Sequence, residues 1–122
     1  MSIAWPALCL AAGCGPSSGS SGTLYQRLQS EDPSVRISAI VQAADEKDRK
    51  AVPYLVERLS DAESDVRFFA YISLQKITGQ TMGYRYYDPP QERAEAVQRW
   101  RQWLKDRGAP PAASQPKGVG SP

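Results

Sequence analysis

The feature that most constrains the fold of this chain is an internal repeat. The segment Leu24-Tyr25-Gln26-Arg27-Leu28 returns 31 residues later as Leu55-Val56-Glu57-Arg58-Leu59. Val35-Arg36 returns as Val66-Arg67 in the same register, and a polar, acid-containing stretch separates the segments both times. Repeats of this length are typical of stacked helical units, each of which buries its apolar face only against a neighbour. The sequence therefore predicts a stack of such units.

The spacing of apolar residues within each unit is helical. Asp32-Pro33 is typical of a helix start, because the carboxylate accepts from free N–H groups and proline fits the first turn. Thr78-Gly79 is typical of a helix end. We predict helices near residues 23–30, 33–45, 49–60 and 64–78. The apolar faces of the last two carry side chains three and four residues apart: Val52, Leu55, Val56 and Leu59, then Val66, Phe69, Ala70, Ser73, Leu74 and Ile77.

The repeated unit resembles the HEAT family, in particular the short repeats of the phycobilin-lyase type, which read approximately Asp-x-x-Val-Arg-x-x-Ala-x-x-Ala-Leu. The resemblance implies an all-α fold, a short α-solenoid of antiparallel helix pairs. It also implies a structural ladder of acids and arginines between successive repeats, formed here by Asp32, Arg36, Glu63 and Arg67. Because Glu63 replaces the aspartate of the family pattern, we expect Asp61 or Ser64 to cap the helix that follows.

Aromatic residues and prolines follow the repeats and predict an ordered loop over residues 80–90. Asp88-Pro89-Pro90 is typical of a capped helix start, and we expect a capping helix over 91–106 that closes a HEAT-like domain spanning 23–107. Its apolar stripe consists of Ala96, Val97, Trp100, Trp103 and Leu104. Packing in the core is the expectation favoured for the two tryptophans. An alternative hypothesis places Tyr84, Tyr86 and Tyr87 in an exposed patch that binds a peptide of a partner or a glycan.

The N-terminal segment resembles a bacterial lipoprotein signal peptide with its lipobox. A short apolar run, Ile3 to Ala12, leads through small residues to Cys14 and then to a Gly/Ser-rich stretch. The resemblance implies a signal peptide over 1–13, lipidation of Cys14, a flexible tether over 14–22 and an exported protein anchored to a membrane, facing the periplasm or the cell exterior. A tail with an incidental cysteine is the alternative. We expect residues 108–122 to be disordered.

Composition argues against most catalytic chemistry. The chain has 15 Lys and Arg, 13 Asp and Glu and no histidine, so the commonest general base and metal ligand is missing. Asp61-x-Glu63-x-Asp65 begins like a calcium loop but lacks its glycine and its final acid. We expect no catalytic residue, cofactor or metal. A protein-interaction or scaffold module is the favoured function. The alternatives are a nucleic-acid binder using Arg93, Arg99, Arg101, Lys105 and Arg107, and a lyase-type enzyme or its accessory subunit.

Overall fold

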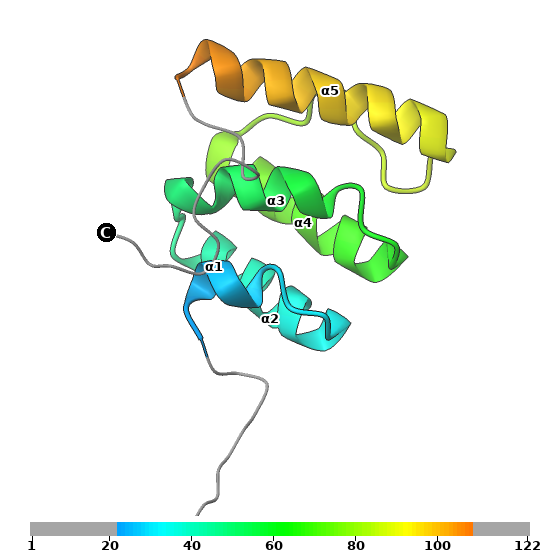
Figure 1. Cartoon of the computed structure of the whole chain (residues 1–122). Helices are drawn as coiled ribbons and strands as arrows, with labels where there is room; N and C mark the ends of the chain where they lie inside the picture. Colours follow the sequence, from blue (N-terminus) through cyan, green and yellow to red (C-terminus); the bar gives the residue numbers. More distant parts are fainter. Residues whose placement is uncertain (1–21, 109–122) are drawn as a thin grey trace, which may run out of the picture.

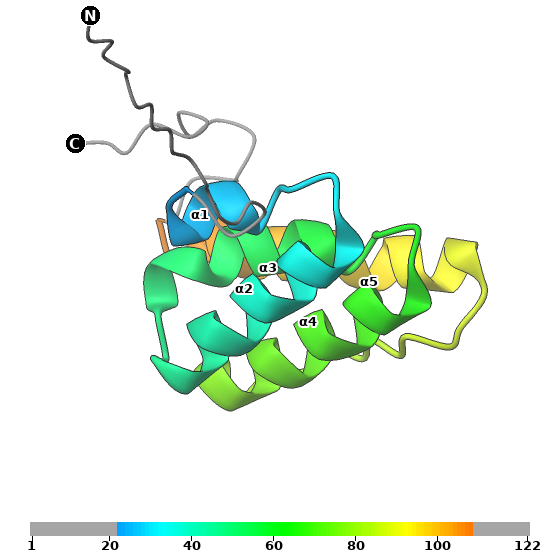
Figure 2. The same cartoon turned by 90° about the horizontal axis from the view of Figure 1, so that it is seen from below.

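The computed structural model describes residues 22–108. Within this range the fold is all-α, as expected, and its helices form two layers (Figures 1 and 2). One layer contains α1, α3 and α5, and the other contains α2 and α4. In chain order the elements are α1 (Leu24–Arg27), α2 (Pro33–Asp45), the 3-10 helix η1 (Arg49–Ala51), α3 (Val52–Arg58), α4 (Ser64–Thr78) and α5 (Pro90–Asp106).

The two long helices of the repeats have the predicted bounds because local signals set their ends. Asp32 caps α2 by accepting from the Ser34 N–H at 2.9 Å, with Pro33 in the first turn. Gly79 ends α4 in the left-handed conformation, at φ 75°. The first predicted helix is much shorter than expected, since the N–H groups of Gln29 and Ser30 turn back to carbonyls three residues earlier.

The core lies between the two layers. Leu55, Leu59, Val66 and Leu74 are fully buried where α3 packs against α4, and Ile40 is buried where α2 packs against α4. Each unit buries its apolar stripe against the next one, which is the arrangement that the 31-residue repeat predicts. The structure of one repeat therefore depends on its neighbour.

The segment after the repeats closes the stack with a helix and a loop. Helix α5 packs against α3 and runs in the opposite direction, while residues 80–89 cross beside α4 (Figure 1). Ala96, Val97, Trp100 and Leu104 are buried, which confirms the capping helix. The predicted cap by Asp88 is wrong. Pro89 occupies the N-cap position, and the Asp88 carboxylate accepts instead from Arg85 Nε at 3.1 Å.

The expected signal peptide, Cys14, most of the tether and nearly all of the C-terminal tail lie outside the described residues. Within the described range, no helix is long and apolar enough to span a membrane.

Candidate interaction surface

A buried ion pair between the two repeats sets the position of α2 against α4. Arg36 Nη2 donates to Asp61 Oδ1 at 2.9 Å, and its Nε lies 2.9 Å from Asp61 Oδ2 at an angle too poor for a hydrogen bond. Arg36 Nη1 also donates to the Ser30 carbonyl at 2.7 Å. Arg58 Nη1 contacts the same Asp61 carboxylate at 3.1 Å, and burial lowers the pKa of Arg58 against the opposing effect of that carboxylate. These contacts join the turns before α2 and α4.

Asp61 is the acid that pairs with Arg36 in this ladder. The prediction that Asp32 and Glu63 supply the acids of the ladder is therefore wrong. The Asp32 carboxylate is occupied at its own helix end, where hydrogen bonds from the Ser34 hydroxyl and N–H hold its pKa below the usual range. Glu63 is exposed, and its N–H donates to Asp61 Oδ1 at 3.0 Å. A residue at the cap faces its own helix, whereas Asp61 precedes the cap by two positions and faces the previous repeat.

Arg67 repeats half of this pattern. Its Nη1 donates to the Asp61 carbonyl at 2.8 Å, as Arg36 does to Ser30, which confirms the predicted register of the two arginines. Within residues 22–108 no third copy of the unit follows α4, and Arg67 Nε faces the Tyr86 carbonyl at 3.5 Å. The loop over residues 80–89 thus takes the position beside α4 that a further repeat would occupy.

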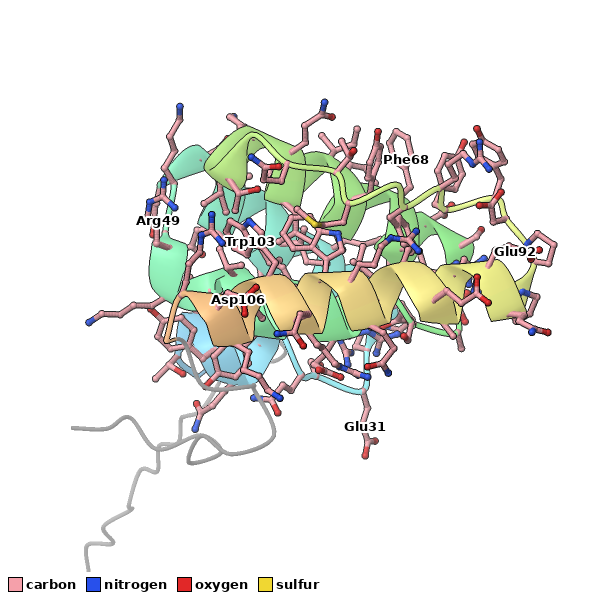
Figure 3. The ribbon with its side chains drawn as sticks, turned by 90° about the horizontal axis from the view of Figure 1, so that it is seen from above. Glu31, Arg49, Phe68, Glu92, Trp103 and Asp106 are labelled. Atoms are coloured by element: carbon pink, nitrogen blue, oxygen red, sulfur yellow. The ribbon has the colours of Figure 1, made fainter. Side chains whose placement is uncertain are left out.

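Four aromatic rings form a continuous row where this loop meets α4. We call this row the aromatic strip: Phe69, Phe68, Tyr86 and Tyr87. Successive ring centroids are 5.6, 4.9 and 5.3 Å apart, and every contact is edge-to-face. In Figure 3, Phe68 lies on the α4 side of the molecule, away from α5. Tyr87 is 69% exposed and the other three rings are partly exposed, so the row is accessible to solvent.

Two aliphatic side chains extend the apolar character of this side. Ile72 lies one helical turn after Phe68 and is 40% exposed, and Val41 is the equivalent residue of α2 in the preceding repeat, at 38%. Val41, Ile72 and Tyr87 are the exposed large hydrophobic residues among residues 22–108. All three belong to α2, α4 or the loop beside α4, so the layer of α1, α3 and α5 exposes no comparable side chain in the described structure.

Tyr84 is not part of this surface, and the prediction that it is exposed is wrong. Its side chain is 2% exposed, and its hydroxyl donates to the Leu59 carbonyl at 2.7 Å. Burial raises the pKa of Tyr84 to about 12. Its ring lies 6.0 Å from that of Tyr71 on α4. Tyr84 therefore anchors the loop and holds Tyr86 and Tyr87 in place.

The cations proposed for nucleic-acid binding are mostly engaged within the chain. Arg93 Nε donates to the Asp88 carbonyl, and Arg99 Nε donates to that of Met82. Arg101 forms an ion pair with Glu57, with Nη2 3.0 Å from Oε1. The Arg107 guanidinium lies over the Trp103 ring, 4.0 Å from its centroid, and Lys105 is exposed. The part of the chain that the structure describes also contains no group of three His, Cys, Asp or Glu residues that could hold a metal ion.

A sequence profile of HEAT repeats matches residues 22–99. The chain belongs to the HEAT-repeat family. The matched range includes both copies of the 31-residue unit, the aromatic loop and more than half of α5, so the family assignment agrees with the two-layer stack of helices. Neither the search of curated proteins nor that of solved structures found a match. HEAT repeats commonly serve as scaffolds for protein interactions.

Phe68 and Phe69 also belong to the strip, although their spacing along the sequence does not mark them as surface residues. The repeat register contained the signal, since Phe69 is equivalent to Ser38, a solvent-exposed serine of α2. Phe69 packs against the hydrophobic core and is partly exposed, so this position is more apolar in the second repeat than in the first.

Proposed function

We propose that this HEAT-repeat protein is a non-enzymatic interaction module that binds a partner protein through the aromatic strip and Ile72. A lipid on Cys14 would anchor it to a membrane outside the cytoplasm. The observation that carries the proposal is the row of solvent-accessible rings on the α2–α4 side, together with the exposed side chains of Ile72 and Val41. Contiguous exposed apolar residues of this kind mark interaction sites, and aromatic residues dominate the energy of protein interfaces.

Contacts within the protein hold the rings of the aromatic strip in place before a partner binds. Phe68 packs edge-to-face against Phe69 on one side and Tyr86 on the other, and Tyr84 anchors the loop by its hydrogen bond to Leu59. A surface that is already ordered loses little side-chain entropy when a partner binds. The HEAT-repeat assignment supports the same function. A nucleic-acid binder has less support, because four of its five candidate cations contact their own chain.

Site-specific photocrosslinking tests the surface. A photoreactive phenylalanine analogue replaces Tyr87 or Ile72 in the full chain, and in matched controls it replaces Gln98 or Ala62, which are exposed residues outside the strip. We expect a discrete crosslinked protein from positions 87 and 72 and none from the controls. Equal crosslinking from all four positions, or none from 87 and 72, would contradict the proposed surface.

The anchor is tested separately by metabolic labelling with a radiolabelled fatty acid. We expect the wild-type protein to carry label and to stay with membranes washed at high salt, and Cys14→Ser to lose the label and to be released by the high-salt wash. An unlabelled wild-type protein in the soluble cytoplasmic fraction would refute export and lipidation, without bearing on the strip.

A further inference from the structure

The described part of the molecule is polarised in charge along its helices. Helices α2, α4 and α5 all begin at one end and finish at the other (Figures 1 and 2). Five exposed acids lie at the end where these helices begin, Glu31, Asp32, Glu63, Asp65 and Glu92, and three lie at the opposite end, Asp45, Glu46 and Asp106. Exposed cations gather at the opposite end, which we call the basic end: Lys47, Arg49, Lys50, Lys76, Lys105 and Arg107. In Figure 3, Arg49 and Glu92 lie at opposite ends of the molecule.

Helix stability accounts for some of these cations but not for those between α2 and α3. Lys76 and Lys105 lie in the last turns of α4 and α5, where a positive charge stabilises a helix. Arg49 and Lys50 lie in η1, at the beginning of α3, where the helix dipole disfavours a positive charge. Lys47 has φ 49°, a conformation that favours glycine. The backbone of Lys47 and the charges of Arg49 and Lys50 are therefore disfavoured by local structure, and such local conflicts are often found at functional sites.

Each carboxylate at the basic end contacts a neighbouring group, and in one case this group is Lys76, one of the six cations. Asp48 accepts from the Tyr25 hydroxyl at 2.8 Å and from the Lys50 N–H at 2.9 Å. Asp45 lies 3.2 Å from Lys76 Nζ. Glu46 and Asp106 accept from the side-chain amides of Gln42 and Gln102. The basic end thus carries six cations and four carboxylates, so its charge is positive, and the side chains of Lys47, Arg49 and Lys50 are exposed.

The N-terminal segment joins the domain at this same end. Helix α1 begins at Leu24, and the bond from the Tyr25 hydroxyl to Asp48 fixes this first turn beside the turn that carries Lys47 and Arg49. Cys14 precedes Leu24 by only ten residues. A lipid on Cys14 would hold the basic end within a few nanometres of the bilayer, since an extended chain spans at most about 3.6 Å per residue.

We propose that the basic end binds the surface of an anionic phospholipid bilayer through Lys47, Arg49 and Lys50, with Lys105 and Arg107 beside them. This rests on and deepens the membrane tether proposed above, because a basic patch adds electrostatic attraction to anionic lipids to the anchoring by the lipid on Cys14. The orientation also suits the aromatic strip. Phe68 and Phe69 lie in the first half of α4, towards the acidic end, so the strip points away from the bilayer.

The test uses the full chain carrying Cys14→Ser, so that no lipid contributes. Flotation measures binding to vesicles of phosphatidylcholine alone and of phosphatidylcholine with about one third phosphatidylglycerol, at low and high salt. The variant Lys47→Gln/Arg49→Gln/Lys50→Gln removes three positive charges from the basic end. The matched control Ala62→Glu/Gln91→Glu/Ala94→Glu changes the net charge equally, through exposed residues at the acidic end.

We expect binding to the anionic vesicles at low salt and none to neutral vesicles, because the attraction is electrostatic. High salt should weaken the binding, because exposed charges are screened beyond about 10 Å at 0.1 M salt. The glutamine variant should bind at least about tenfold more weakly, and the glutamate control within about threefold of the parent. Absence of binding to anionic vesicles, or equal losses in both variants, would overturn the proposal. Tighter binding to a short DNA duplex than to vesicles would also overturn it. None of these outcomes depends on crosslinking at the strip or on lipidation of Cys14.

Discussion

The hydrogen bond that anchors the aromatic loop gives a prediction with a pH dependence that can be worked out from the structure. Tyr84 is buried and its hydroxyl donates to the Leu59 carbonyl at 2.7 Å. Tyr84→Phe keeps the ring and leaves that carbonyl without its donor. Near neutral pH we expect the free energy of unfolding to fall by about 1 to 2 kcal/mol, the usual effect of losing one partner of a buried hydrogen bond.

Alkaline pH should reduce this difference. The pKa of Tyr84 is about 12 in the folded protein and 10.0 in an unperturbed side chain. Because the folded pKa is the higher one, the stability that depends on the protonated hydroxyl is complete below pH 10 and is lost as the pH rises towards 12. Near pH 11 the wild-type protein should have lost about 1.4 kcal/mol through this group. The phenylalanine variant has no such loss, so the two proteins should become almost equally stable.

Urea unfolding followed by circular dichroism at pH 7 and pH 11 measures the difference directly. Tyr25, whose pKa burial also raises to about 12, is present in both proteins and cancels from the comparison. Tyr87→Phe is the matched control, because its side chain is 69% exposed and its loss should change stability by no more than about 0.5 kcal/mol. A difference between wild type and Tyr84→Phe that stays constant or grows with pH would refute the reasoning.

Four further substitutions test the fold. Asp61→Ala should lower the free energy of unfolding by about 3 to 5 kcal/mol, because it leaves the buried Arg36 without its acid. Asp32→Ala should lower it by only about 1 kcal/mol, because it removes a helix cap. Equal losses in chemical denaturation would contradict the ladder. Lys47→Gly should raise the melting temperature, since φ 49° costs a residue with a side chain about 1 kcal/mol. Gly83→Ala should lower it, because φ is 70° and the new Cβ would lie 3.1 Å from the Arg99 guanidinium. An unchanged melting temperature would contradict either expectation.

The candidate surface was only partly predictable. Tyr86 and Tyr87 were candidates from the sequence, and the structure places both in the aromatic strip. Tyr84 stands two residues before Tyr86 and has the same side chain, yet it is buried against a residue 25 positions away. No local pattern distinguishes the three tyrosines, because their burial depends on where the loop crosses α4. Phe68 gave no surface signal by itself, since its spacing fits a helix in any environment.

What the sequence determined by itself is the set of helices and their repetition. The bounds of α2 and α4 follow from Asp32, Pro33 and Gly79, whose effects act within one turn of the chain. The 31-residue register correctly placed Arg36 and Arg67 in equivalent positions.

The tertiary structure alone decided how these helices are joined. Arg36 pairs with Asp61 rather than with the acid at its own helix cap, and α5 packs on α3 while the loop occupies the position beside α4. These contacts join residues 25 or more positions apart, as Arg36–Asp61, Tyr84–Leu59 and Arg101–Glu57 do. Their choice depends on which buried groups find partners once the layers have packed, and a short stretch of sequence does not encode that.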